Sequence, residues 1–175
     1  MSATASTPAE SSTALPAKQP FSLEAVRLMP AWAEALQRFF KDIDAGGDGA
    51  YFNPHPTDTE SLERLAGHRG RDLYYVLIEQ GKVLGYGLLR GWDEGYEIPS
   101  LGLAIHPTAR GQGLGRMLMK LLHVLAIRQG ARHVRLRVHV GNTKALGLYQ
   151  SLGYRFEPDA NDREYLVGFK HLHHE

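Results

Sequence analysis

A glycine-rich segment, RGQGLG at residues 110–115, has the residue types that bind a phosphate group. It follows an apolar run typical of a strand and precedes a long run with helical periodicity. Backbone amides at the start of a helix and the positive end of its dipole favour an anion. Glycines let the anion approach the backbone, and Arg110 and Arg116 can add charge-assisted hydrogen bonds. The segment therefore predicts a pyrophosphate site, with a tight strand-to-helix turn as the alternative that needs no ligand.

Two common phosphate loops do not match this segment. A dinucleotide fingerprint needs a glycine at the position of Arg116. A P-loop ends in Gly-Lys-Ser/Thr, and that ending is absent here. The segment is therefore a different kind of phosphate loop, or only a turn.

The helix that would present these amides is expected over residues 113–129, with Gly130 ending it. One face of this helix is apolar, and we expect it to be buried. It comprises Leu114, Met117, Leu118, Leu121, Leu122 and Leu125. The other face carries Arg116, Lys120 and His123.

Strands are expected on both sides of this helix, because apolar and β-branched residues fill short runs bounded by turn residues. Before the helix they cover residues 21–28, 73–79, 82–90 and 99–105, with a tight hairpin turn at Gln80-Gly81. After it they cover 133–140, 154–156 and 164–169. Further helices are expected from Pro30 to Ile43, over 59–66 with Asp58 as its cap, and over 143–152. Residues 45–57 form a loop between the first two of these helices.

This order of elements predicts an α+β fold. A strand on each side of the long helix implies one parallel crossover at the glycine-rich segment, inside a twisted sheet that is otherwise mostly antiparallel and flanked by helices. Residues 21–175 would form one domain. Residues 1–20 are mainly Ser, Thr, Ala and Pro, too poor in large apolar side chains to bury a core, and are expected to be a tail.

Composition limits the classes of function. A hydrophobic content of 43% indicates a globular protein. A formal net charge of +1 does not indicate nucleic acid or an anionic membrane as a binding partner. The sequence has no cysteine, which excludes disulfides and thiolate chemistry and agrees with a cytoplasmic protein. Neither a membrane span nor a signal peptide is evident. His171, His173 and His174 are expected to be solvated, so no metal is assigned.

Two blocks of the sequence resemble the GNAT N-acetyltransferase superfamily. Its signature Gln/Arg-x-x-Gly-x-Gly/Ala is matched by Arg110, Gly113 and Gly115 in the frame LGLAIHPTARGQGLGRMLMKLL. A second block, a strand followed by Asn and then by Tyr seven residues later, is similar to LRVHVGNTKALGLYQSLGYRF, which contains Asn142 and Tyr149. The resemblance extends over residues 101–155, about a third of the chain.

The resemblance implies an N-acetyltransferase that takes acetyl-CoA as acyl donor and a primary amine of a small molecule or peptide as acceptor, as a monomer or homodimer. It implies that the strand before the loop pairs with the pantetheine arm, that the loop amides wrap the pyrophosphate and that Asn142 bonds the arm. The implied cofactor residues are Leu103, Ala104, Ile105, Arg110, Gly111, Gln112, Gly113, Leu114, Gly115, Arg116 and Asn142. A backbone amide at the end of the 101–105 strand would meet the oxyanion.

The resemblance assigns the proton for the departing thiolate to Tyr149. From the residues alone, Tyr149 is equally a packing residue on the apolar face of a short helix, and Asn142 is equally the cap of that helix. Likewise, the fold could retain acyl-CoA as a sensor and catalyse nothing. The presence of Tyr149 and Asn142 at the family's positions favours the enzyme.

No residue matches the general base of the family. Several members have a glutamate where this chain has Pro99, and others have one where it has Arg137. Glu97 would face the same way as Pro99 if the strand extended that far, so it is the first candidate for the base. His55 and His139 are weaker candidates, and water alone is a further alternative.

Overall fold

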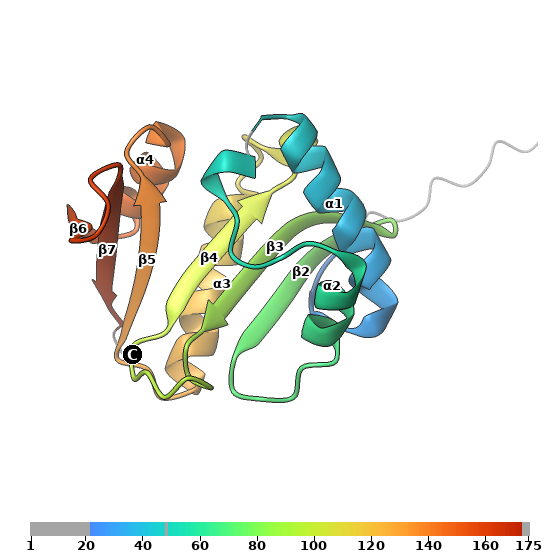
Figure 1. The fold of residues 1–175 in the computed structure, drawn as a ribbon, viewed down its shortest axis with the longest axis horizontal. Coiled ribbons are helices and arrows are strands. Elements are labelled where there is room, and N and C mark those ends of the chain that lie inside the picture. Colours follow the sequence, from blue (N-terminus) through green and yellow to red (C-terminus); the bar gives the residue numbers. More distant parts are fainter. Residues whose placement is uncertain (1–21, 48, 173–175) are drawn as a thin grey trace, which may run out of the picture.

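The structure is a computed structural model that describes residues 22–47 and 49–172, so the expected tail at 1–20 lies outside the described residues. Within these ranges a seven-stranded sheet has the order β1-β2-β3-β4-β5-β7-β6 (Figure 1). Its strands are β1 (Leu23–Arg27), β2 (Leu73–Glu79), β3 (Lys82–Arg90), β4 (Ser100–Ile105), β5 (His133–His139), β6 (Arg155–Pro158) and β7 (Tyr165–His171). The helices are α1 (Ala33–Ala45), α2 (Thr59–Ala66), α3 (Leu114–Arg128) and α4 (Thr143–Ser151). Short 3-10 turns lie at Pro30–Trp32, Gly49–Tyr51 and Pro107–Ala109.

The pairing of the strands confirms the predicted α+β class. Every neighbouring pair is antiparallel except β4 and β5, which are parallel and are connected through α3. The hairpin between β2 and β3 turns at Gln80 and Gly81, both with positive φ (48° and 77°). This is the backbone that a two-residue hairpin turn needs.

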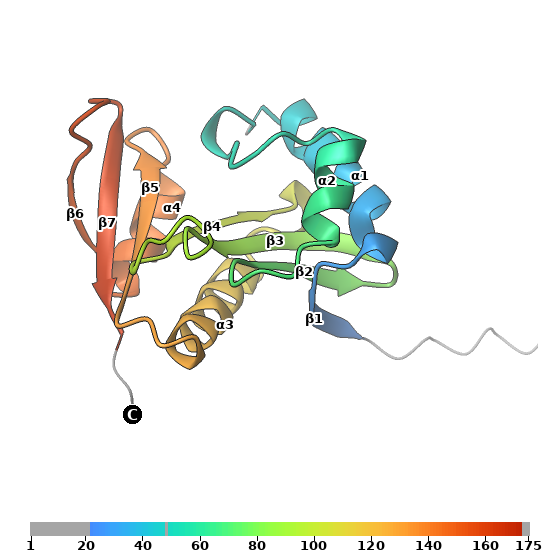
Figure 2. The same ribbon diagram turned by 60° about the horizontal axis from the view of Figure 1, so that its bottom comes forward.

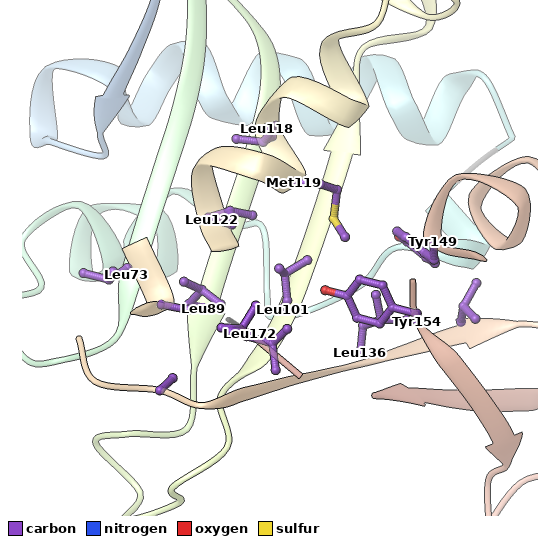
Figure 3. Packing of buried hydrophobic residues seen from close by; sticks show 14 of the residues in the cluster. Leu73, Leu89, Leu101, Leu118, Met119, Leu122, Leu136, Tyr149, Tyr154 and Leu172 are labelled. Atoms are coloured by element: carbon purple, nitrogen blue, oxygen red, sulfur yellow. The ribbon is translucent and has the colours of Figure 1, made fainter. Parts of the chain in front are cut away.

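Helices cover both faces of the sheet. Figure 2 shows α1 and α2 on one face and α3 on the other. The side chains therefore form two clusters, one between α1, α2, β2 and β3 and the other around α3, β5 and α4. Leu118, Met119 and Leu122 of α3 lie in the second cluster, which also contains Tyr149 and Tyr154 (Figure 3).

Two side chains of α3 differ from the expected faces. His123 was expected on the polar face but is 8% exposed, and Met117 was expected on the apolar face but is 41% exposed. α3 packs on β3 and β4, and Tyr154, which follows α4, covers the side of the helix that carries His123. The periodicity of a single helix could not show this, because Tyr154 comes from a distant part of the chain.

Candidate active site

The glycine-rich segment forms the connection between the end of β4 and the start of α3. Gly111 and Gly113 have φ values of 74° and 82°, in the left-handed region that glycine adopts without strain. A Cβ added at either position would meet no heavy atom within 4 Å. Gly113 is the N-cap of α3, and no side chain caps this end of the helix. The first-turn amides of α3 are thus presented at an open surface, which fits a phosphate group.

The two arginines that flank this segment have different roles in the structure. Arg110 Nε donates a hydrogen bond to the carbonyl of Ile105, at 3.0 Å, and so folds back on the end of β4. Arg116 Nη2 donates to Ser151 Oγ at 2.7 Å and links α3 to the end of α4. Both residues flank the open helix end in the sequence, so the segment carries two cationic side chains.

The sheet splits beside this loop. β4 and β5 pair at one register, Ser100 opposite Arg135, and Arg135 N–H donates to the Pro99 carbonyl at 3.0 Å. By contrast, β4 pairs regularly with β3 along its whole length. Because backbone groups alternate in direction along a strand, the N–H and C=O of Leu103 point toward β5 and have no strand partner there. Figure 1 shows the two strands diverging toward the end where α3 begins.

The second block of the resemblance lies on the β5 side of this split. Asn142 Oδ1 accepts a hydrogen bond from Ala145 N–H at 3.2 Å, so Asn142 caps α4. Tyr149 lies on α4, is 9% exposed and packs against Tyr154 with ring centroids 5.9 Å apart. Burial raises the pKa of Tyr149 to about 12. The phenol is therefore fully protonated at neutral pH.

Behind Tyr149 the structure contains a buried pair that the sequence did not predict. Tyr154 Oη and His123 Nε2 are 2.8 Å apart, and this contact joins α3 to the segment between α4 and β6. Burial lowers the pKa of His123 to about 4, so its ring is neutral at pH 7. The sequence pattern placed His123 on the polar face of the helix, so it did not predict a buried hydrogen bond to Tyr154.

A group of rings lies at the carboxyl end of β5, on the face opposite α3. His139 lies 5.2 Å from Tyr51 and 5.2 Å from Tyr165, measured between ring centroids. Its Nδ1 accepts a hydrogen bond from Gly141 N–H at 2.9 Å. In the neutral ring this fixes the proton on Nε2. Tyr51 and Tyr165 could not be predicted from the sequence, since neither belongs to a spaced motif and only the fold brings them to His139.

Arg137 stands where the resemblance implied a glutamate, and the structure shows it engaged with its neighbours. Its guanidinium donates to Asp159 at 2.6 Å and to Asp162 at 3.0 Å. Its Cζ lies 3.6 Å from the centroid of the Tyr165 ring. These ion pairs raise the pKa of Arg137 further. Arg137 thus holds the β6–β7 connection against β5 and cannot act as a base.

His55 is also engaged. Its Nδ1 lies 2.9 Å from the Pro56 carbonyl, to which it donates, and its Nε2 lies 2.7 Å from Tyr86 Oη. Burial lowers the pKa of His55 below its usual value. With both nitrogens occupied, His55 anchors the loop before α2 over the sheet.

Glu97 does not lie on an extension of β4. That strand begins at Ser100 and Glu97 is in an exposed bend, so the strand does not extend far enough for Glu97 to face the same way as Pro99 along it. It lines a cavity together with the residues that follow α3, at the end of this helix opposite the glycine-rich segment. The structure therefore does not bring Glu97 together with Tyr149.

Two further observations concern metals and membranes. In residues 22–47 and 49–172 there is no group of three or more His, Asp or Glu side chains that could hold a metal ion. His171 packs against His133 with ring centroids 4.8 Å apart, and the other two C-terminal histidines lie outside these ranges. None of the described helices has the length and apolar character needed to cross a membrane.

Known proteins resemble this chain in sequence. Residues 30–154 match the model of the acetyltransferase (GNAT) family. Over 92 residues the chain is 36% identical to a mycothiol acetyltransferase of Streptomyces bingchenggensis, an alignment that covers 51% of this chain and 28% of that protein. The chain spans about a quarter of the length of the curated relatives it matches.

Solved structures share the fold. A GCN5-related N-acetyltransferase from Kribbella flavida superposes with a TM-score of 0.68 at 26% identity, covering 86% of this chain and 98% of that one. A GNAT-family acetyltransferase from Streptococcus pneumoniae superposes with a TM-score of 0.72 at 18% identity, covering 87% and 100%. The family model, which extends over well more than half of the chain, settles the assignment. On this evidence the chain belongs to the GNAT acetyltransferase family.

Proposed function

We propose that this protein is an acetyl-CoA-dependent N-acetyltransferase that acetylates a primary amine. The observation that carries the proposal is the split between β4 and β5, which opens beside an uncapped helix N-terminus and has Tyr149 on its β5 side. Acetyl-CoA would supply the thioester carbonyl that the amine attacks. Family membership and the acetyltransferase names of the relatives support the same activity.

In this proposal the loop and the split strand bind the donor. The amides of 112–115 hold the pyrophosphate, and Arg110 and Arg116 add positive charge beside it. The backbone of 103–105, and above all the unpaired N–H and C=O of Leu103, bonds the pantetheine arm as an additional strand would. Asn142 caps α4 through Oδ1, which accepts from Ala145 N–H. The side-chain NH₂ of Asn142 remains available to donate a hydrogen bond to the pantetheine arm.

Tyr149 Oη donates the proton that the departing sulfur takes up. A phenol with a pKa of about 12 is a weak acid beside a thiol, whose pKa is about 8.5 in water. Burial raises the pKa of a thiol in the same enclosed space, because desolvation disfavours every anion. The difference between the pKa of the Tyr149 phenol and the pKa of the buried thiol is therefore close to the difference between the two groups in water, about 1.5 pKa units.

The amine gives up its proton to water rather than to a side chain. While His139 Nδ1 accepts from Gly141, Nε2 carries the ring proton and cannot take another. His55 has both nitrogens engaged, and Glu97 lies away from Tyr149. A backbone amide on the β5 side of β4, such as that of Leu103, meets the negative charge that develops on the carbonyl oxygen.

The acceptor would reach the split from the face that carries α1, α2 and the ring group Tyr51, His139 and Tyr165. The name of the curated relatives, mycothiol acetyltransferase, favours a small-molecule amine over a peptide. The absence of cysteine from the sequence suits a cytoplasmic enzyme, which would act as a monomer or homodimer.

The test is release of CoA thiol from acetyl-CoA, measured with a thiol reagent across amino acids, aminosugars, aminoglycosides and peptides. An enzyme releases thiol only when a suitable amine is present, and the acetylated amine appears in equal amount. Binding of acetyl-CoA with no acceptor-dependent release across the panel would instead support a non-catalytic acyl-CoA sensor. No binding at all would contradict both functions.

A further inference from the structure

The connection between β3 and β4, residues 91–99, is held in a fixed shape by two aspartates. Asp72 is 5% exposed, and its Oδ1 accepts from the backbone N–H of Gly91 and Trp92, each at 2.9 Å, and of Asp93 at 3.3 Å. The Asp93 carboxylate in turn accepts from the N–H of Arg71 at 2.8 Å and of Asp72 at 3.0 Å. These reciprocal bonds preorganise the connection before any ligand arrives.

This braced connection forms one wall of a cavity of about 590 Å³. The other wall is the segment 129–133, which leads from α3 into β5. The cavity is thus at the opposite end of α3 from the glycine-rich segment, and a helix of 15 residues is about 22 Å long. Figure 1 shows the start of β5 and the end of β4 at opposite ends of the sheet. The volume is within the range of small-molecule sites.

The charge that lines the cavity is mainly positive. Arg71 and Arg132 contribute two guanidinium groups, and among the described residues neither forms an ion pair with a carboxylate. Glu97 is the one acidic residue among those lining the cavity. The carboxylates of Asp72 and Asp93 do not line the cavity, and their oxygens accept hydrogen bonds from backbone N–H groups behind its wall. The cavity therefore favours an anion.

The rim of the cavity adds apolar surface. Tyr96 is 63% exposed and Ile98 is 36% exposed, two of the large apolar side chains that the structure leaves open to solvent. Trp92 lies in the floor with its ring mostly packed, and Arg71 Cζ sits 5.8 Å from the centroid of that ring. A flat hydrophobic group would cover Tyr96 and Ile98 while its charge met the arginines.

We propose that this cavity is a second ligand site, separate from the acyl-donor site, and that it takes a small organic anion carrying a flat hydrophobic group. Aromatic carboxylates, sulfonates and phosphates share this chemistry. The proposal does not depend on acetyl transfer, because it rests on the cavity alone.

The test is titration of the full chain with 1-naphthalenesulfonate, followed by the fluorescence of Trp92 in a Trp32→Phe background, where Trp92 is the one tryptophan left. Saturable quenching is expected. Arg71→Gln and Arg132→Gln should each weaken the affinity about tenfold, the worth of one charge-assisted hydrogen bond. Glu97→Gln should strengthen it, because it removes the negative charge from the lining.

Three controls decide the outcome. Arg128→Gln removes an exposed cation of α3 that does not line the cavity, and it should leave the affinity unchanged. Sulfate, which lacks the ring, and 2-naphthalenemethanol, which lacks the charge, should both bind more weakly than the probe. Equal weakening by Arg128→Gln, no effect of either cavity arginine, or displacement of the probe by saturating acetyl-CoA would each overturn the proposal.

Discussion

At the scale of single residues, burial decides the protonation state of Tyr149 and His123. Both side chains contact Tyr154, and desolvation moves each toward its neutral form. Tyr149 thereby keeps its proton over the whole physiological range. His123 stays uncharged and can hold Tyr154 through a neutral hydrogen bond.

Replacing Tyr149 by Phe keeps the ring and removes the one atom that can donate a proton. Turnover should fall by roughly 10²- to 10⁴-fold, the usual contribution of a positioned general acid, while acetyl-CoA affinity changes little. Since the pKa of Tyr149 is about 12, the wild-type rate should show no decline from its deprotonation between pH 7 and pH 10. Single-turnover acetylation within a few-fold of wild type in Tyr149→Phe would show that the hydroxyl only packs.

The neutral state of His123 should make the protein sensitive to acid. Its pKa is about 4 in the folded state and 6.5 in the unfolded state, so between these values the unfolded state binds the extra proton. The stabilisation is complete above pH 6.5 and is lost as the pH falls toward 4, by at most about 3 kcal/mol. His123→Gln, which keeps a partner for Tyr154, should reduce this loss.

Urea unfolding at pH 7.0 and pH 4.5 measures the effect. The free energy of unfolding should fall more between these two pH values in the wild type than in His123→Gln. Equal falls in the two proteins would mean that His123 is protonated in the folded state without cost.

The candidate site could be predicted from the sequence only where a role belongs to a local motif. Arg110, Gly113 and Gly115 follow one another along the chain, so their turn and the helix after it were predictable. The ring group of Tyr51, His139 and Tyr165 was not, because its members come from three distant segments. The buried pair of His123 and Tyr154 was missed because helical periodicity cannot show which elements cover a helix.

At the scale of elements, the strands and helices were predicted to within a few residues, because each is bounded by glycine, proline or a capping side chain. Asp58 caps α2 as expected, accepting from Ser61 N–H. The divergence of β5 from β4 was not predictable from either strand, since both have ordinary strand patterns.

The start of β4 at Ser100 has a consequence for Glu97. Because Glu97 is in a bend rather than on the strand, Glu97→Gln should leave the acidic limb of the pH–rate profile in place and the maximal rate within about threefold of wild type. Steady-state rates from pH 5 to pH 9 measure this. Disappearance of the acidic limb in Glu97→Gln would restore Glu97 as the base and contradict the assignment of that role to water.

At the scale of the whole molecule, the division of the chain into residues 1–20 and a domain at 21–175 remains a proposal. The first segment is mainly Ser, Thr, Ala and Pro, so its removal costs little buried apolar area. Deleting residues 1–20 should leave the melting temperature and the acetyl-CoA affinity nearly unchanged. A fall in melting temperature of several degrees would show that this segment contributes to the folded core.

The central claim is that the molecule binds acetyl-CoA at the open end of α3, and calorimetric titration with acetyl-CoA tests it most directly. Gly113→Asp places a side chain and a negative charge where the pyrophosphate would lie. Gly81→Asp introduces the same charge at another glycine with positive φ and open surroundings, 77° against 82°, in the β2–β3 turn. Both variants must first show wild-type circular dichroism.

We expect the wild type and Gly81→Asp to bind acetyl-CoA tightly. The affinity of Gly113→Asp for acetyl-CoA should be lower by about 100-fold or more, because two or more hydrogen bonds to an anion are lost. Equal affinity in all three proteins would contradict the central claim.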